Sequence, residues 1–210
     1  GRLLDALEAS GEAENTLVVF QVDNGGCHVE YTPDRTGVFL KETTRDGRPM
    51  IPGNVPGVMP GPENTFQSYG YGWANVSNTP FRLFKQHDHE GGIVVPLIAS
   101  WPRVIRQTGE LTAQLAHVID LMPTFLDAAD VAYPREFEGR TIVAADGDSL
   151  IPVFRGEQRE PHKTLYWEWS RGRAMRQDRW KLVSLKNQPW ELYDIEADGT
   201  ELHDLATEQP

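Results

Sequence analysis

The chain has 210 residues, of which 39% are hydrophobic and 24% are charged, and this composition is typical of a globular protein rather than a disordered one. Its 20 basic and 31 acidic residues give a formal net charge of −11, and because no basic patch stands out we expect no nucleic-acid partner. Cys27 is the single cysteine, which excludes an intramolecular disulfide, and the longest apolar runs are too short to span a membrane.

The first predicted elements lead to a polar turn. Residues 2–9 place three leucines on one face of a helix, and Gly11 is its expected end. The β-branched and aromatic run at residues 16–22 predicts a strand buried on both faces of a parallel sheet. The strand stops at residues 23–26, Asp-Asn-Gly-Gly. Ligands in open α/β sheets bind beyond the carboxyl ends of strands, so this turn is a candidate binding site.

The middle of the chain combines a long irregular segment with a second strand and a helix. Residues 25–80 are rich in Gly and Pro, and a loop of this length in a compact domain is either functional or packs over an edge. Residues 81–90 are expected to contain a helical turn, and residues 93–100 a second buried strand. Asp120 is a candidate N-cap for a helix over residues 122–129.

Short aromatic strands characterise the C-terminal part. Residues 146–159 have a linker-like composition. The strands expected after them form an antiparallel meander, at residues 165–169, 174–176, 180–185 and 190–195. The predicted fold class is therefore α/β, with residues 1–145 as part of a parallel-sheet domain and residues 146–210 as a small antiparallel α+β subdomain.

The oxygen atoms offered at the end of the first strand favour a hard cation. Asp23 supplies a carboxylate and Asn24 an amide oxygen, and such ligands suit Ca²⁺ or Mg²⁺ rather than Zn²⁺. The alternative is a simple turn, because Asp, Asn and Gly dominate turns, and the local pattern by itself favours that alternative. His28 and Glu30 follow the pair closely and are candidates for the lining of a pocket.

Other polar residues are also open to two interpretations. Lys85 carries a compact charge that can meet a sulfate oxygen directly, although a lysine viewed alone is more often a solvated surface residue. His87 and His89 form a His-x-His pair without further ligands at a convincing spacing, so a structural or surface role is favoured. His117 precedes an apolar run and is interpreted as a packing histidine.

Five segments in sequence order resemble the sulfatase family of the alkaline-phosphatase-like superfamily, and the bacterial arylsulfatase type in particular. The matching segments are residues 15–20 with 23–26, 73–75 with 78–85, 89–93 with 96–98, 117–124, and 190–194 with 201–205. A single Asp-Asn-Gly is weak evidence, but five ordered matches over nearly the whole chain argue against a chance resemblance.

The resemblance implies a role for three residues. Asp23 and Asn24 match the second pair of ligands of the active-site metal, which is usually Ca²⁺, with Mg²⁺ as the alternative. Lys85 matches the lysine that contacts the sulfate and the leaving group. In this family a formylglycine hydrate attacks sulfur and releases the alcohol, and sulfate is then eliminated. The resemblance thus implies a sulfuric ester hydrolase, a small-molecule sulfate ester as substrate, and a periplasmic or extracellular parent protein.

The sequence departs from the family at the nucleophile. Formylglycine forms from Cys or Ser in a Cys/Ser-x-Pro-x-Arg motif, but Cys27 lies outside such a motif, and residues 31–35 have Tyr at the decisive position. In the family the nucleophile and the first pair of Asp ligands precede the segment seen here, so we infer that the N-terminal half is absent. This chain alone is expected to hold Ca²⁺ weakly, to lack turnover, and to self-associate through an exposed sheet edge.

Two alternative functions stay open. The first is a phosphonate or phosphate diester hydrolase of the same superfamily, although those relatives tend to carry His where this chain has Asn24. The second is a non-catalytic binding module or an inactive relative of the enzymes. The upstream coding sequence discriminates between these alternatives, because an intact nucleophile motif there excludes the second.

Overall fold

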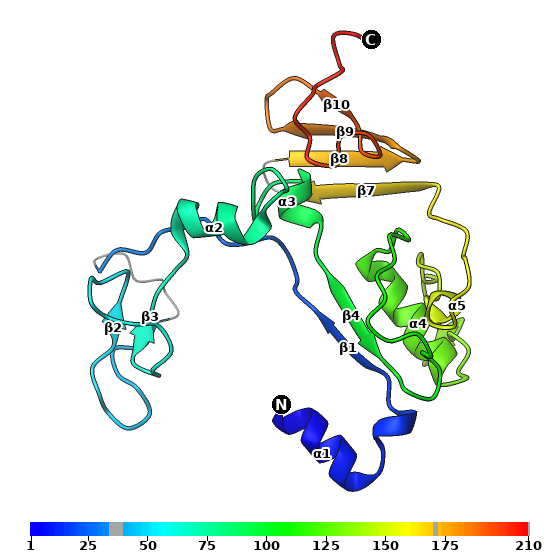
Figure 1. Ribbon diagram of the computed structural model, residues 1–210, viewed down its shortest axis with the longest axis horizontal. Helices are drawn as coiled ribbons and strands as arrows, with labels where there is room; N and C mark the ends of the chain where they lie inside the picture. Colours follow the sequence, from blue (N-terminus) through cyan, green and yellow to red (C-terminus); the bar gives the residue numbers. More distant parts are fainter. Residues whose placement is uncertain (34–39, 170–171, 210) are drawn as a thin grey trace. The chain divides into compact units, whose positions relative to one another are not determined.

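The computed structural model describes residues 1–33, 40–169 and 172–209, so part of the 31–35 segment lies outside the described residues. The chain divides into two compact units, the first comprising Gly1–Gln21 and Pro96–Lys163, the second Val22–Val95 and Thr164–Pro210 (Figure 1). A domain boundary between residues 145 and 146 stays a prediction. Within the described ranges, no helix combines the length and apolar character needed to cross a bilayer.

The first unit begins with the predicted helix, α1 (Arg2–Ser10). Gly11 ends it in the left-handed conformation at φ 76°, and its N–H bonds to the carbonyls of Glu8 and Leu7, as expected for a C-terminal glycine. The other elements of this unit are η1 (Ala13–Asn15), β1 (Val18–Gln21), β4 (Leu97–Ser100), η2 (Val118–Asp120), α4 (Leu121–Ala128), β5 (Glu136–Phe137), β6 (Arg140–Thr141) and α5 (Ile151–Phe154).

The pairing of β1 corrects the predicted parallel sheet. β1 pairs antiparallel with β4, in a register that places Val18 opposite Ser100 and Gln21 opposite Leu97. The chain leaves β1 and enters β4 at the same end of the pair, which requires opposite strand directions. Burial on both faces was also wrong for this chain, because Phe20 is 63% exposed and Ile98 62% exposed. The second strand is shorter than predicted, because it begins only at Leu97, and Ile93 belongs to a helical turn instead.

The segment predicted as a linker carries the core of the first unit. Leu150, Ile151 and Phe154 are buried, and they pack against partly buried side chains that include Leu97 and Trp101. The linker interpretation of residues 146–159 was therefore wrong. Its polar and glycine-rich residues concealed one short apolar turn, α5, whose buried side chains supply the hydrophobic stabilisation of this unit.

Asp120 occupies the predicted cap position before α4, but its side chain does not cap that helix. Its Oδ2 accepts hydrogen bonds from the backbone N–H of His117 at 2.9 Å and from Arg159 at 2.9 Å. Its Oδ1 accepts from the N–H of Asp148 at 3.0 Å and bonds to His162 Nε2 at 2.8 Å. Burial acts to raise the pKa of Asp120, but these donors outweigh burial and lower it. This carboxylate therefore joins the start of α4 to the segment around α5.

The second unit places short elements inside the long Gly- and Pro-rich segment. β2 (Ile51–Pro52) and β3 (Thr65–Phe66) pair in parallel, and α2 (Gly70–Asn78) follows them. α3 (Glu90–Ile93) is the single turn that ends before Val94. The predicted long loop is thus real over much of its length, but it includes a helix and a strand pair that its weak periodicity did not indicate.

The C-terminal sheet confirms the predicted antiparallel meander. Its strands are β7 (Thr164–Trp169), β8 (Gly172–Gln177), β9 (Trp180–Leu185) and β10 (Glu191–Asp194), in the spatial order β10-β9-β8-β7. Figure 1 shows the four strands side by side. Ala174, Val183 and Tyr193 form the buried core of one face, as the two-residue periodicity of strands requires.

Candidate functional site

The predicted metal-binding turn is attached by its backbone to the segment that carries Lys85. The N–H of Gly25 donates to the carbonyl of Gly92 at 3.1 Å, and the N–H of Lys85 donates to the carbonyl of Gly26 at 3.1 Å. Asn78 bridges the same two segments, because its Oδ1 accepts from the N–H of Gly26 at 2.9 Å while its Nδ2 donates to the carbonyl of Leu83 at 3.0 Å. Two segments far apart in sequence therefore meet at this turn.

Glycine is required on both sides of this contact. A Cβ atom on Gly25 would lie 1.8 Å from the carbonyl oxygen of Gly91, and one on Gly91 would lie 2.3 Å from the carbonyl oxygen of Arg82. A Cβ on Gly26 would lie 3.2 Å from Cα of Ala74, a residue of α2 that is fully buried. The close approach of three backbone segments thus explains the small residues in the motifs.

The side chains of the three candidate site residues are available for a ligand. Asp23 is exposed, and no hydrogen bond or ion pair joins its carboxylate to any residue in the described ranges. Asn24 donates its Nδ2 to the carbonyl of Gly25 at 2.9 Å, which leaves its Oδ1 for another contact. Lys85 is half-buried, and its ammonium has no acidic partner among the residues that the structure describes.

Aromatic packing fixes the segment beside Lys85. Phe84 is 6% exposed, and its ring stacks on His28 with 4.3 Å between the centroids. Tyr71 of α2 lies against the same pair, 5.1 Å from the His28 ring and 5.4 Å from the Phe84 ring. His28 therefore packs next to the candidate site, whereas Glu30 is exposed close to the start of α2.

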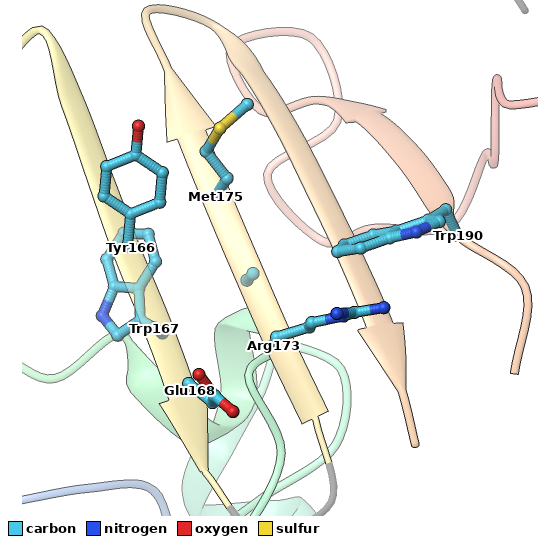
Figure 2. A pocket seen from close by; sticks show the side chains of 7 residues that line it. Tyr166, Trp167, Glu168, Arg173, Met175 and Trp190 are labelled. Carbon is cyan, nitrogen blue, oxygen red and sulfur yellow. The ribbon is translucent and has the colours of Figure 1, made fainter. Parts of the chain in front are cut away.

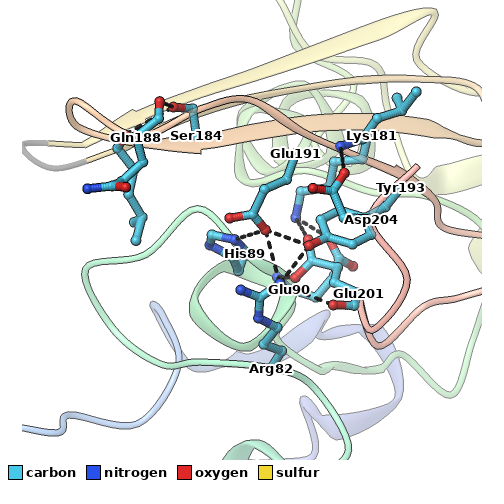
Figure 3. Close-up of polar contacts among 12 residues, drawn as sticks. Arg82, His89, Glu90, Lys181, Ser184, Gln188, Glu191, Tyr193, Glu201 and Asp204 are labelled. Carbon is cyan, nitrogen blue, oxygen red and sulfur yellow. Dashed lines mark hydrogen bonds and ion pairs between the residues drawn. The ribbon is translucent and has the colours of Figure 1, made fainter. Parts of the chain in front are cut away.

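A partly buried polar network joins Arg82 and His89, which flank Lys85 in sequence, to the C-terminal sheet (Figure 3). Arg82 Nη1 donates to Glu191 Oε2 at 3.0 Å and to the Tyr193 hydroxyl at 2.6 Å. His89 Nε2 bonds to the same Glu191 oxygen at 3.2 Å, and its side chain is fully buried. The contacts of His89 are therefore those of a structural residue. The network joins residues 82–89 to β10.

The second half of the network is centred on Lys181 of β9. Its Nζ donates to Glu90 Oε1 at 2.6 Å and forms an ion pair with Glu201 Oε1 at 2.8 Å. Glu201 Oε2 accepts the backbone N–H of Glu90 at 2.8 Å. The Lys181 and Glu201 side chains are 0% exposed and that of Glu90 is 6% exposed. Sequence reasoning gave these residues no role, although Glu90 and Glu201 lie in residues 89–93 and 201–205, two of the segments that resemble sulfatases.

Burial and hydrogen bonding compete in setting the pKa values of this network. Desolvation lowers the pKa of His89 to about 4 despite the neighbouring Glu191, so the imidazole is neutral at pH 7 and donates its Nε2 proton to the carboxylate. Burial acts to raise the pKa of Glu191, but hydrogen bonds from Tyr193 and His89 outweigh burial and lower it. Burial raises the pKa of Glu201, an effect that Lys181 opposes.

Neither the histidine pair nor the open sheet face forms a metal centre. Across the described ranges, no group of three or more His, Cys, Asp or Glu side chains could hold a metal ion. The other face of the C-terminal sheet has an open pocket of about 420 Å³, and the cation Arg173 lies 4.7 Å from the centroid of the Trp190 ring there (Figure 2). The other lining residues are Tyr166, Trp167, Glu168, Ala174 and Met175, so none of the candidate site residues faces this pocket.

Two family models match the chain. The model described as "Sulfatase" matches residues 1–131, and the model described as "N-sulphoglucosamine sulphohydrolase, C-terminal" matches residues 81–210. The two matches overlap at residues 81–131, which include Lys85, α3 and Asp120.

Individual relatives give the same result. An uncharacterized sulfatase of Schizosaccharomyces pombe is 32% identical, over 100% of this chain and 38% of its own length. An arylsulfatase of Klebsiella aerogenes is 29% identical, over 79% of this chain and 34% of its own length. The solved structure of BT4656 in complex with its substrate, D-glucosamine-2-N,6-O-disulfate, is similar with a TM-score of 0.60 and 23% identity, over 100% of this chain and 35% of that one. The chain thus spans only 34–38% of the length of these three proteins.

Proposed function

Because the chain belongs to the sulfatase family and corresponds to its C-terminal portion, we propose that it supplies part of the active site of a sulfuric ester hydrolase. Asp23 and Asn24 would bind a divalent cation, Ca²⁺ in the first place and Mg²⁺ as the alternative, and Lys85 would contact the sulfate group. The observation that carries this proposal is the attachment of Lys85 to the Asp23–Gly26 turn, where the three side chains have no acidic or basic partner among the described residues.

The oxygen atoms of the turn fit a hard cation. Asp23 offers both carboxylate oxygens, and the hydrogen bond from Asn24 Nδ2 to Gly25 leaves the amide oxygen free. Ca²⁺ takes six to eight oxygen ligands, so these two residues supply part of a coordination shell and the remainder would come from outside the described residues. When bound, the cation would neutralise charge on the sulfate oxygens.

Lys85 would act on the anionic substrate. Its ammonium is a compact charge without a competing carboxylate, so it is free to bind a sulfate oxygen and to stabilise negative charge as the bond to the leaving alcohol breaks. The proposed substrate is a small-molecule sulfate ester. The sulfated sugar in the similar structure of BT4656 supports this substrate class.

The nucleophile would come from a segment outside this chain. Family resemblance makes it a formylglycine, and residues 1–210 contain no Cys or Ser in the required motif. We propose that the isolated chain is inactive and self-associates through the β1–β4 pair, where Phe20 and Ile98 are largely exposed. A parent protein located in the periplasm or outside the cell fits the same resemblance.

The test is the hydrolysis of an aryl sulfate by the complete protein that contains this chain. We expect Lys85→Ala and Asp23→Ala to lower kcat/KM at least about 100-fold, because each removes a preorganised charge or ligand. Chelation should abolish turnover, and added Ca²⁺ should restore it. Lys186→Ala is the matched control, because Lys186 is exposed and lies in the same unit.

Four results would contradict the proposal. Full activity of Lys85→Ala would show that Lys85 does not act on the sulfate. Turnover by the isolated 210-residue chain would show that no nucleophile from another segment is needed. Faster hydrolysis of a phosphonate monoester or a phosphate diester than of any sulfate ester assigns the chain to the other branch of the superfamily. Sulfate-ester binding without turnover by the complete protein indicates a binding module instead.

A further inference from the structure

The charges around Lys181 form a closed unit that includes backbone. One buried ammonium contacts Glu90 at 2.6 Å and Glu201 at 2.8 Å, and the second oxygen of Glu201 binds the N–H of Glu90 at 2.8 Å (Figure 3). The side chain of Glu90 is therefore held by Lys181 of β9, and its backbone is held by Glu201 in the segment after β10. Glu90 is the first residue of α3, so this unit determines where that turn lies.

Few hydrogen bonds separate α3 from the candidate site. The N–H of Gly91 donates to the carbonyl of Arg82 at 2.9 Å, three residues before Lys85, and the carbonyl of Gly92 accepts the N–H of Gly25 at 3.1 Å. Lys85 and Gly26 then bind each other through their backbones. A displacement of α3 would therefore act on the turn that carries Asp23 and Asn24 and on the segment that carries Lys85.

Buried ion pairs contribute little net stability, because desolvation offsets most of the attraction, and specifying one arrangement is the role to be tested for them here. The Lys181 ammonium keeps both carboxylates as partners only while Glu90 and Glu201 stay within reach of it. The glycines around α3 leave no space for rearrangement, since a Cβ on Gly92 would lie 2.0 Å from the carbonyl oxygen of His87. Lys181, Glu90 and Glu201 together can thus fix the position of α3 rather than merely attach two segments.

We propose that Lys181 is a positioning residue for the sulfatase site. Through Glu90 and α3 it holds the Asp23–Gly26 turn and Lys85 at the separation that the substrate and the cation need. This inference rests on the proposed function, because it assigns a task to a residue that touches neither ligand. The C-terminal sheet is then part of the catalytic apparatus, although its own open pocket lies on the opposite face.

The experiment compares Lys181→Met, Lys181→Arg and the exposed control Lys186→Met in the complete protein. Amide hydrogen exchange is measured by mass spectrometry on peptides that cover residues 24–26 and 84–92. We expect Lys181→Met to raise exchange at least about tenfold in these peptides while α4 keeps its wild-type rate. For an aryl sulfate we expect kcat/KM to fall about 10- to 100-fold, because small displacements of positioned groups are costly in rate.

Lys181→Arg retains a buried positive charge, so its exchange rates and its kcat/KM should lie between those of Lys181→Met and the wild type. Lys186→Met should match the wild type in both quantities. A purely structural role predicts a lower melting temperature with unchanged kcat/KM per folded molecule, and that result overturns the proposal. If Lys181→Met does not fold, Glu201→Gln decides the question with the same readouts, because it removes one charge and keeps the side-chain volume. Unchanged exchange at residues 24–26 in a folded Glu201→Gln variant also overturns the proposal.

Failure of the proposed function gives a different result. If the wild-type protein hydrolyses no sulfate ester, the kinetic arm is lost, but the exchange rates at residues 24–26 and 84–92 still report whether Lys181 holds the turn and the Lys85 segment together.

Discussion

Two groups of charged residues in the second unit differ in their partners. In the first group, Asp23 and Lys85 carry charges that no described residue neutralises, and both are accessible to solvent. In the second group, Lys181, Glu90 and Glu201 are buried and mutually paired. Unpaired groups at the surface retain binding capacity, while paired buried groups fix geometry. Substitutions should therefore separate the two groups: those at Asp23 and Lys85 should lower activity and leave stability unchanged, whereas those at the buried pairs should lower stability and, at Lys181, activity as well.

The largest effect on stability is expected where the backbone of Gly25 contacts that of Gly91. Gly25→Val places a side chain where the Gly91 carbonyl oxygen lies 1.8 Å from an ideal Cβ, and backbone on both sides prevents relief. We expect a loss of more than about 4 kcal/mol in the free energy of unfolding, measured by chemical denaturation of the complete protein. Gly72→Ala in α2 is the control: no atom lies within 4 Å of its Cβ position, so stability should stay level or rise.

Asp120, a buried carboxylate in the first unit, provides an independent test of whether buried paired charges stabilise the fold. Asp120→Ala removes the carboxylate shared by Arg159 and His162. Arg159 then keeps the carbonyls of Asp148 and Leu115 as acceptors, but no carboxylate among the described residues pairs with its buried guanidinium. The expected loss is about 3–5 kcal/mol in the free energy of unfolding, because an uncompensated buried charge remains. Glu8→Ala on the exposed side of α1 should change stability by less than about 0.5 kcal/mol. Equal effects of the two substitutions would contradict the distinction.

The buried histidine should make stability depend on pH. The pKa of His89 is lowered to about 4 in the folded protein from an ordinary value of 6.5, so its contribution is fully present above pH 6.5 and is lost as the pH falls toward 4. The contribution amounts to at most about 3 kcal/mol. We expect the unfolding free energy of His89→Gln to fall less steeply over this range than that of the wild type. Parallel pH profiles of the two proteins would show that another group causes the loss.

The smallest effect on stability is expected at the candidate ligands. Asp23→Ala and Lys85→Ala remove charges without internal partners, so the free energy of unfolding should change by less than about 0.5 kcal/mol while turnover is lost. Denaturation and kinetics on the same preparations measure both quantities. A loss of more than about 1.5 kcal/mol in Lys85→Ala would place Lys85 with the structural residues instead.

Local patterns predicted the elements whose stabilisation is local. The end of α1 at Gly11 follows from left-handed backbone that glycine adopts readily, and the strands of the C-terminal sheet follow from short aromatic runs separated by turn residues. The segment around α5 was misjudged because a single apolar turn gives no periodic signal. The direction of β1 was misjudged because a run of apolar residues indicates burial without indicating a partner.

The sequence by itself determined the order of motifs, the family resemblance and the candidate residues Asp23, Asn24 and Lys85, because residue type and spacing carry that chemistry. Only the tertiary structure decided that Gly26 binds Lys85 through the backbone, and that Lys181 lies between Glu90 and Glu201. Lys181 is separated from Glu90 by 91 positions in the chain, and no local pattern distinguishes a strand lysine that faces solvent from one that faces two buried carboxylates. Its role depends on which face of β9 packs on α3, and packing of the whole unit determines that face.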